Sequence, residues 1–442
     1  MIKQLSDYDD CTTHLDQPIA VYSGRIIARG CFWSDVLDMA QTLPERDFVI
    51  NLCQNRYLFI VTLLAAAVRN QTCLLPPSNQ SGPISELCRD YPGAYIVSEA
   101  VCHQPADWFQ PQEPQSTQQA TAPKLDWQSA RLIAFTSGSS GKPQPHSHSF
   151  ETFRISAQMA TTRLGLENRA WLMVSTTPAQ HMYGLETSIF WPLFSQLILH
   201  DGRPFFPEDL RQVLKTSPWP AVLVTTPAHL RHFIDLNLAD TKLQKIISAT
   251  DTLSSKLAQQ CQEHLGLSPL EIYGSTESLS FASRETLQSD MWQLYEGCQL
   301  TPDQAGKPWL SARHLPVPLL LQDHIQLYQD RNFTVLGRHH DMVKIAGKRA
   351  SLNELNRLLT DIDGVDDGFF FVITDPRTDN RLGAVVVSQL EKPAIKQALA
   401  PHIDEVLLPK KIHCVDRIPR NPAGKLLQAE QEKLLSALNL LP

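Results

Sequence analysis

The stretch FTSGSSGKPQPHSHS, residues 135–149, has the composition of a phosphate-binding loop. Four hydroxyl side chains in it can donate hydrogen bonds to phosphate oxygens, and they belong to Thr136, Ser137, Ser139 and Ser140. Gly138 and Gly141 allow close backbone approach, so successive amides can form an anion nest, and Lys142 adds positive charge. A Walker A loop needs four residues between its first glycine and its Gly-Lys pair, whereas Gly138 and Gly141 are closer and Pro143 follows Lys142. The sequence therefore predicts a phosphate site of another class, the alternative being a flexible surface loop.

A second stretch, EIYGSTES at 271–278, places an aromatic ring, small turn residues, a hydroxyl and a carboxylate directly after a predicted strand. Tyr273 could stack on a base and Thr276 could reach a phosphate. Glu277 could hold Mg²⁺, which prefers one or two carboxylates together with substrate phosphates. The alternative is a strand end followed by a helix cap with a glutamate in the first turn.

Two further stretches carry basic side chains near the end of the chain. They are GRHHDMVKIAGKR at 337–349 and PRNPAGK at 419–425. Taken alone, Lys425 in the second stretch would be a solvated surface charge.

Strands alternating with helices must position these segments. Short apolar runs, each ending in a small or polar turn, occur at 131–135, 171–175, 221–226, 245–250 and 270–275. A helix-like segment at 227–238 follows the third run. This alternation predicts an α/β fold whose loops gather at the carboxyl ends of the strands. Beyond 349, predicted strands at 368–374 and 382–388 and a helix near 393–403 indicate a small α+β unit.

The composition excludes several classes of protein. With 442 residues, 43% hydrophobic and 19% charged, the chain is globular and long enough for two or three domains. The net charge of −7 and the lack of a Lys/Arg block argue against nucleic-acid binding. The nine cysteines form no CxxC pair, which favours reduced thiols in a cytoplasmic protein over disulfides or a zinc site.

No integral membrane association is expected either. The first residues lack the apolar core of a signal peptide. The longest apolar run, 57–68, is too short to span a bilayer and predicts a buried helix. The Pro/Gln-rich stretch 104–123 predicts a surface connection.

Together the four motifs resemble the acyl-adenylate-forming superfamily, which includes acyl- and aryl-CoA synthetases, adenylation domains of peptide synthetases and luciferases. The resemblance runs from about 132 to 425, in the family's order and near its spacings. It implies a large N-terminal multi-sheet α/β domain, residues 1–337, and a small mobile α+β C-terminal domain, 338–442, carrying Lys425.

The resemblance also implies roles for individual residues. The loop from Thr136 to Gly141, with Lys142, would cradle the β- and γ-phosphates of ATP, and Glu277, with Thr136, would hold Mg²⁺. The other residues expected to bind the nucleotide are Tyr273 at adenine, Gly274, Ser275 and Thr276 near the α-phosphate, Asp323 and Arg338 at the ribose, and Arg349 near the phosphates. Lys425 would stabilise the carboxylate and the leaving pyrophosphate, and His181 in TTPAQHMYG, 176–184, would guard the carboxylate site. The residues expected to line the acid pocket are Tyr183, Ser248, Ala249 and Thr250, and His340 stands at the family's hinge.

The chain departs from the family pattern at several positions. The family usually has lysine at Gln144, glycine at Pro145, and Asp or Lys at His340. The usual threonine before Asp323 is missing, and the stretch from Glu277 to Asp323 is short. These features resemble compact ligases that load aryl or hydroxyacyl groups onto carrier proteins.

The implied function is ATP-dependent activation of a small carboxylic acid as an acyl-adenylate, followed by transfer to the phosphopantetheine thiol of an acyl carrier protein. One alternative is a ligase that uses free CoA. Another is a pseudoenzyme that binds AMP or an acyl-adenylate without catalysis. The small residues at 248–250 and 274–275 do not favour an amino-acid substrate.

Overall fold

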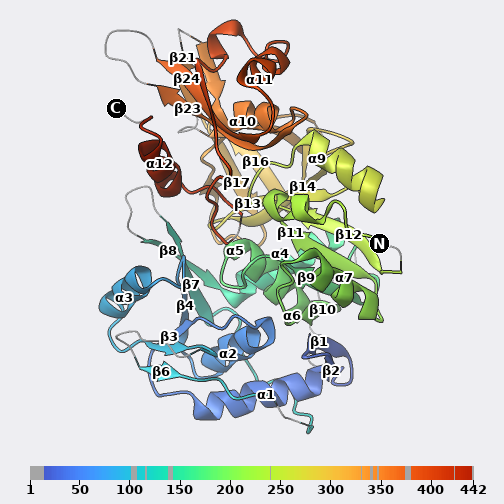
Figure 1. Ribbon diagram of the computed structural model, residues 1–442. Coiled ribbons are helices and arrows are strands. Elements are labelled where there is room, and N and C mark those ends of the chain that lie inside the picture. Colours follow the sequence, from blue (N-terminus) through green and yellow to red (C-terminus); the bar gives the residue numbers. More distant parts are fainter. Residues whose placement is uncertain are drawn as a thin grey trace.

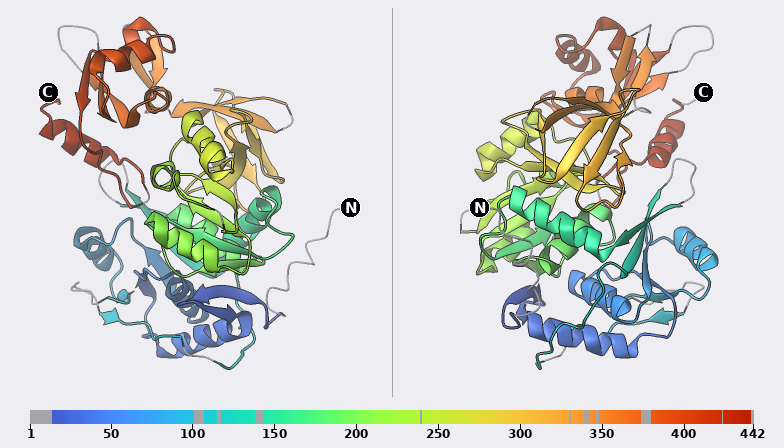
Figure 2. Two further views of the ribbon diagram at one scale, coloured as in Figure 1. Left: turned by 45° about the vertical axis from the view of Figure 1, so that its right-hand side comes forward. Right: turned by 180° about the vertical axis from the view of Figure 1, so that it is seen from behind.

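The computed structural model describes residues 14–100, 107–114, 117–137, 143–238, 240–329, 331–338, 342–345, 348–373, 380–422 and 424–440. Two large sheets and their helices form the N-terminal domain, and a smaller domain of strands and helices lies at one end of it (Figure 1). The chain passes from the first domain to the second after β20, and the segment before α12 returns toward the first domain (Figure 2).

The larger sheet has eleven strands, of which one part is parallel and the rest antiparallel. In order across the sheet they are β19 (Asp323–Leu327), β20 (Asn332–Arg338), β15 (Trp292–Leu294), β14 (Leu279–Glu285), β13 (Leu270–Ser275), β12 (Leu243–Ser248), β11 (Ala221–Thr225), β9 (Trp171–Ser175), β10 (Leu197–His200), β1 (Pro18–Tyr22) and β2 (Arg25–Ala28). From β13 to β1 the neighbours are parallel, and at both edges they are antiparallel. The parallel part therefore places several strand ends at one edge.

The second sheet carries the predicted phosphate loop. Its strands, in order, are β6 (Trp108–Phe109), β5 (Tyr95–Val97), β3 (Phe48–Asn51), β4 (Thr72–Leu75), β7 (Arg131–Ser137) and β8 (Pro143–Ser149). β7 and β8 are antiparallel and flank residues 138–142. The five apolar runs are thus strands as predicted, but the first belongs to a different sheet from the other four.

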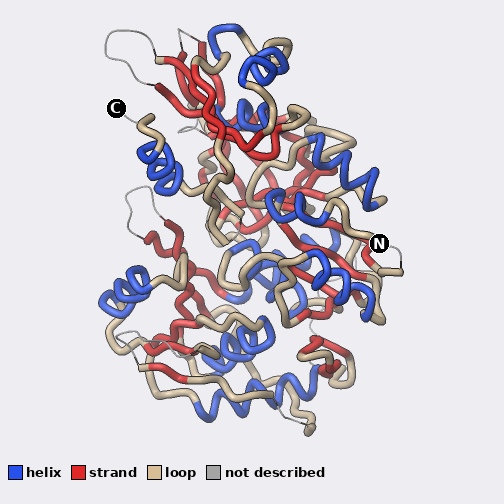
Figure 3. The backbone as a smooth tube through the Cα atoms, viewed as in Figure 1, coloured by secondary structure: helices blue, strands red, loops and turns tan. Residues whose placement is uncertain are grey.

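Helices fill the space between the sheets and cover their outer faces, as Figure 3 shows in blue. The main core lies between the sheets and includes Val49 of β3 and Met173 of β9. The helices there are α1 (Arg29–Thr42), α2 (Arg56–Val68), α4 (Phe150–Arg163), α5 (Met182–Leu185), the π-helix η2 (Glu186–Phe190) and α6 (Trp191–Leu193). The helices on the outer faces are α3 (Ser81–Asp90), α7 (Pro207–Thr216), α8 (Pro227–Leu230), the 3₁₀ helix η3 (Arg231–Phe233), α9 (Ser255–Gln260) and the π-helix η4 (Cys261–Leu265).

Alternating side chains explain this layering. In β9, Trp171 and Met173 belong to the core between the sheets, whereas Leu172 and Val174 belong to the outer cluster under α7 to α9. A strand with both faces buried reads as a continuous apolar run, as these did in the sequence.

The apolar run at 57–68 forms the buried helix that was predicted. The side chain of Asn55 caps α2 by accepting hydrogen bonds from the backbone amides of Tyr57 and Leu58. Within the described chain, no helix has the length and apolarity that a membrane span requires. The cysteines that the structure describes, Cys31, Cys53, Cys73, Cys88, Cys261, Cys298 and Cys414, are all free thiols.

The C-terminal domain has its own cores. Its strands are β21 (Met342–Ile345), β22 (Lys348–Ser351), β23 (Val365–Ile373), β24 (Arg381–Ser388) and β25 (Lys411–Cys414). Its helices are α10 (Leu352–Thr360), α11 (Lys392–Leu399), the 3₁₀ helix η6 (Glu405–Leu407) and α12 (Gln428–Ala437). One face of the β23–β24–β25 sheet packs on α10 and α11, and the other packs on α12. The predicted fold class is confirmed, while the boundary between 337 and 338 stays a prediction.

The three-stranded sheet of β16 (Cys298–Pro302), β17 (Pro308–Ala312) and β18 (Leu319–Leu320) completes the N-terminal domain. It occupies much of the short stretch between Glu277 and Asp323 and joins the main core through Leu300 and Leu310.

Candidate functional site

Four parallel strands end at one edge of the larger sheet. β9, β11, β12 and β13 are successive neighbours there, and each is followed by small polar residues. Because carboxyl ends of parallel strands share an edge, the loops at 176–181, 226, 248–251 and 275–278 come together. This is where the sequence predicted the site loops to gather.

The turn after β13 is held by its own serines. The amide of Ser275 donates to Ser278 Oγ at 2.9 Å, and the amide of Ser278 donates to Ser275 Oγ at 3.2 Å. A Cβ on Gly274 would lie 2.0 Å from the carbonyl oxygen of Leu279, so only glycine fits beside the returning strand. The turn therefore presents Thr276 and Glu277 in a defined conformation.

His146 joins this turn to the strand before the phosphate loop. Its Nε2 lies 3.1 Å from Thr136 Oγ1 on β7 and 3.6 Å from Glu277 Oε1. The His146 side chain is 18% exposed and Glu277 is 44% exposed, so the carboxylate keeps an open side. The two residues predicted to hold Mg²⁺ are thus brought to one imidazole. A hydroxyl and a carboxylate with room for phosphates and water suit Mg²⁺, whereas within the described chain no group of three or more His, Cys, Asp or Glu side chains forms a protein-only metal cage.

Two more histidines support the turn. A ring nitrogen of His314, Nε2, lies 2.7 Å from the carbonyl oxygen of Ser278, to which it can donate. His148 hydrogen-bonds the backbone of Thr276, and burial lowers the pKa of His148 to about 4. The sequence reasoning assigned His146, His148 and His314 no role. The spacing of His146 and His148, two apart on one strand, puts them on the same face and is the signal that could have found them.

Tyr273 packs in an aromatic cluster. Its ring centroid lies 5.3 Å from Phe281, 5.0 Å from Trp292 and 5.7 Å from Phe333. The side chain is half-buried, so the cluster fixes the plane of a ring that is still partly accessible.

Asp323 and Arg338 lie opposite each other. β19 and β20 form an antiparallel hairpin in which the two residues are direct partners, at one end of the ladder. The two residues that the resemblance assigns to the ribose are therefore brought side by side by this hairpin.

The predicted acid pocket has buried polar atoms. His181 Nδ1 and Ser248 Oγ are buried with no hydrogen-bond partner among the described residues, as expected of groups that await a ligand. Burial, with a smaller contribution from the charge of Lys425, lowers the pKa of His181 to about 4. The hydroxyl of Tyr183 donates to the carbonyl oxygen of Ile247 at 2.9 Å, which ties α5 to the end of β12.

Ala249 and Thr250 follow β12 and are half-buried. Thr250 has φ +78°, a conformation that strains a β-branched residue. Such strain collects at functional sites, where the surrounding structure holds it in place.

The C-terminal domain brings Lys425 to this edge. The Lys425 amide donates to Asn421 Oδ1 at 2.8 Å, and the Asn421 amide donates to the Lys425 carbonyl oxygen at 2.9 Å, which closes the loop. Arg203 of the N-terminal domain donates to the carbonyl oxygens of Pro422 and Thr176, both at 2.7 Å. This arginine therefore ties the Lys425 loop to the segment that precedes His181.

Some predicted residues lie outside this description. Gly138, Ser139, Ser140, Gly141, Lys142 and His340 fall outside the described residues, and the backbones of Ser137, Arg338 and Arg349 are described without their side chains. Arg349 lies on β22, opposite Lys344 of β21.

The sequence matches the AMP-binding enzyme family over residues 34–313. A 4-coumarate–CoA ligase of Halorhodospira halophila is 28% identical over 315 residues, 67% of this chain and 74% of the ligase. Bacitracin synthase 3 of Bacillus licheniformis is 25% identical over 307 residues, 58% of this chain and 5% of that much longer protein.

Solved structures share the whole fold. The o-succinylbenzoate–CoA synthetase of Bacillus subtilis, solved with its acyl-adenylate intermediate, superimposes with a TM-score of 0.80 at 15% identity, covering 98% of this chain and 99% of that one. ATP-bound MatB of Rhodopseudomonas palustris gives the same TM-score at 16% identity, with 98% and 99% coverage.

Proposed function

The chain belongs to the family of AMP-binding enzymes and is an AMP-forming acid–thiol ligase, and we propose that it loads a small carboxylic acid onto the phosphopantetheine thiol of an acyl carrier protein. Formation of an acyl-adenylate from ATP is the reaction typical of this family. The identity of the acid and of the thiol carrier is the part that is proposed.

One observation carries most of the proposal. Arg203 donates to the carbonyl oxygen of Pro422 in the Lys425 loop and to that of Thr176 in the segment before His181, so the lysine loop lies beside the predicted carboxylate site. Two anionic reactants, a carboxylate and ATP, need positive charge between them, and this arrangement supplies it.

The chemistry proceeds in two steps. A carboxylate oxygen attacks the α-phosphorus of ATP, the bond to the β-phosphate breaks, and pyrophosphate leaves. The thiol sulfur then attacks the carbonyl carbon of the mixed anhydride, its proton is lost, and AMP leaves with the electron pair of the broken C–O bond. Alignment of the reactants within one pocket accounts for much of the acceleration in such bimolecular steps.

Residues of this chain have defined tasks in the first step. Lys425 would neutralise the carboxylate and the departing pyrophosphate, and the loop after Thr136 would hold the β- and γ-phosphates. Tyr273 would stack on adenine. Thr136 and Glu277 would hold Mg²⁺, which when bound neutralises charge on the phosphates. In the second step, the C-terminal domain would turn about the segment around His340 to admit the thiol.

The acid is most simply an aryl acid. The residues at the end of β12 and directly after it, Ser248, Ala249 and Thr250, are small, and no carboxylate among these three would bind an α-amino group. The relative from Halorhodospira halophila bears the name of a 4-coumarate ligase. We therefore choose 4-coumarate as the first probe.

ATP–pyrophosphate exchange with a panel of aryl, fatty and hydroxy acids, 4-coumarate included, tests the proposal. Exchange that depends on one class of acid supports it. The accepted acid is then offered with free CoA or with a holo carrier protein, and a preference for CoA would favour the acid–CoA ligase alternative. Nucleotide binding without exchange on any acid would favour the pseudoenzyme.

A further inference from the structure

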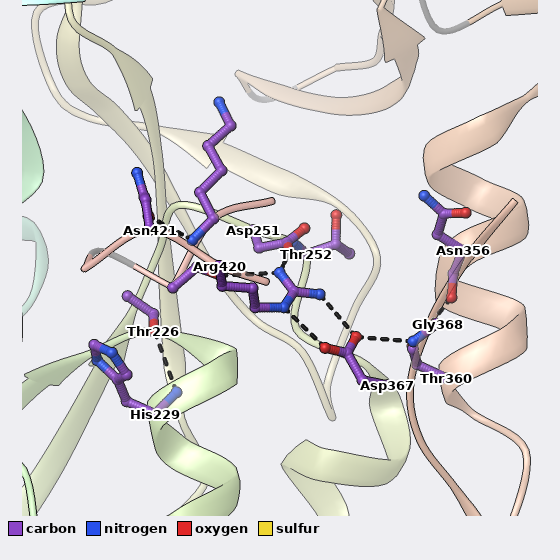
Figure 4. Close-up of polar contacts among 12 residues, drawn as sticks. Thr226, His229, Asp251, Thr252, Asn356, Thr360, Asp367, Gly368, Arg420 and Asn421 are labelled. Carbon is purple, nitrogen blue, oxygen red and sulfur yellow. Dashed lines mark hydrogen bonds and ion pairs between the residues drawn. The ribbon is translucent and has the colours of Figure 1, made fainter. Parts of the chain in front are cut away.

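Arg420 contacts carboxylates of both domains. Its Nε and Nη2 donate to Asp367 at 2.9 and 2.8 Å, a two-pronged pair within the C-terminal domain, and its Nη1 lies 3.1 Å from Asp251 Oδ2 in the N-terminal domain. Figure 4 shows the guanidinium between the two aspartates. Two-pronged arginine–carboxylate pairs fix orientation as well as distance, so Asp367 sets the direction in which Arg420 faces Asp251.

The same guanidinium holds the loop of Lys425. Arg420 Nη1 also donates to the carbonyl oxygen of Gly424 at 2.9 Å, one residue before Lys425. A Cβ on Gly424 would lie 2.6 Å from Thr226 Oγ1, so the loop lies directly against the end of β11. Any shift of Arg420 relative to Asp251 therefore moves the backbone that carries Lys425.

This contact differs from the other ion pairs between the domains. The Arg420 and Asp367 side chains are each 17% exposed and Asp251 is 46% exposed. Lys256 Nζ and Asp363 Oδ1, 3.0 Å apart, also join the domains, but Asp363 is 98% exposed. Solvent weakens such exposed pairs far more than half-buried ones.

Asp251 lies directly after the strand end that forms the predicted acid pocket. It is adjacent to the strained Thr250, and its Oδ1 accepts a hydrogen bond from the amide of Thr252 at 2.9 Å. The amide of the next residue thus helps to orient the Asp251 carboxylate.

We propose that Asp251 is a positioning residue which, through Arg420, holds Lys425 in place for acid activation, and that this contact is broken for transfer to the thiol. The proposal rests on the proposed function and deepens it. It assigns a role in holding the Lys425 loop against the end of β11 to the ion pair between Asp251 and Arg420.

The test compares Asp251→Asn, Lys425→Ala and the double variant in acid-dependent ATP–pyrophosphate exchange, with 4-coumarate or whichever acid the panel identifies. Asp251→Asn should lower the exchange rate about 10-fold and leave the KM for ATP within about 2-fold. In the Lys425→Ala background the same change should have almost no further effect, because the residue it positions is absent. Transfer from supplied acyl-adenylate should not slow. Asp363→Asn is the matched control and should leave exchange unchanged.

Equal losses from Asp251→Asn with and without Lys425 would overturn the proposal, as would an unchanged rate. If none of the acids supports ATP–pyrophosphate exchange by the wild type, the proposed function is refuted. The contact between Asp251 and Arg420 is then tested by a measurement that needs no substrate. Fluorescence energy transfer between labels at the exposed positions Lys215 and Ser436, introduced through unnatural amino acids, reports the distance between the domains. Asp251→Asn should broaden that distance distribution and Asp363→Asn should not, and equal distributions in all three proteins would overturn the proposal.

Discussion

His146 Nε2 lies 3.6 Å from Glu277 Oε1, and this contact joins β8 of the six-stranded sheet to the turn after β13 of the eleven-stranded sheet. The same nitrogen lies 3.1 Å from Thr136 Oγ1. One imidazole therefore sets the separation of the hydroxyl and the carboxylate that are proposed to hold Mg²⁺.

Replacing His146 should weaken metal binding more than nucleotide binding. In His146→Ala, Thr136 and Glu277 lose their common partner, and we expect the Mg²⁺ concentration for half-maximal pyrophosphate exchange to rise about 5- to 10-fold, the scale of one typical net hydrogen bond. The variant His146→Gln keeps a hydrogen-bond donor, and its Mg²⁺ requirement should lie between those of the wild type and His146→Ala. His402→Ala, an exposed histidine in the C-terminal domain, is the control. An unchanged Mg²⁺ requirement would reduce His146 to a packing residue.

Lys425 should act only in the first half-reaction. Lys425→Ala should lower acid-dependent pyrophosphate exchange about 100-fold or more, the scale of losing one preorganised electrostatic donor. Thioester formation from supplied acyl-adenylate should be much less affected, because the lysine serves the departing pyrophosphate. Equal loss in both assays would contradict the assignment of Lys425 to acid activation.

Gly274 should not tolerate a side chain. In Gly274→Ala the new Cβ would lie 2.0 Å from a backbone oxygen, so β14 must shift. We expect the free energy of unfolding, measured with urea, to fall by about 2–3 kcal/mol and ATP–pyrophosphate exchange to be lost. Gly82→Ala is the matched control, because nothing lies within 4 Å of its Cβ, and its stability should stay within about 1 kcal/mol of the wild type. A stable, active Gly274→Ala protein would show that the turn can shift without consequence.

Buried histidines should make the fold sensitive to acid. Burial lowers the pKa of His148 and of His229 to about 4, below the unfolded value near 6.5. Between these values the unfolded chain binds more protons, so stability is full above about pH 6.5 and is lost as the pH falls toward 4.

The variant His229→Asn separates one of these contributions. His229 Nδ1 lies 2.9 Å from Thr176 Oγ1, a contact that an asparagine amide can replace without a titrating group. Between pH 6.5 and 5, the free energy of unfolding measured with urea should fall less in His229→Asn than in the wild type. The difference should be up to about 1.4 kcal/mol per pH unit. Parallel pH curves for the two proteins would mean that His229 does not contribute.

The strands, the buried helix at 57–68 and the site loops follow from local features of the sequence. A run such as WLMVS is apolar at every position because both faces of β9 are covered, and such runs are visible without a partner. Asp323 and Arg338 were assigned from the family resemblance, and their pairing across the β19–β20 hairpin is a finding of the structure.

The tertiary structure decided which distant side chains meet. Nothing in the spacing of residues 146 and 277 indicates that one imidazole contacts Glu277, because those residues belong to different sheets and meet only when the sheets pack. The position of Arg420 between Asp251 and Asp367 likewise depends on how one domain docks on the other. Local sequence specifies backbone periodicity and turns, whereas contacts such as these come from the packing of layers, which is set by all the apolar faces together.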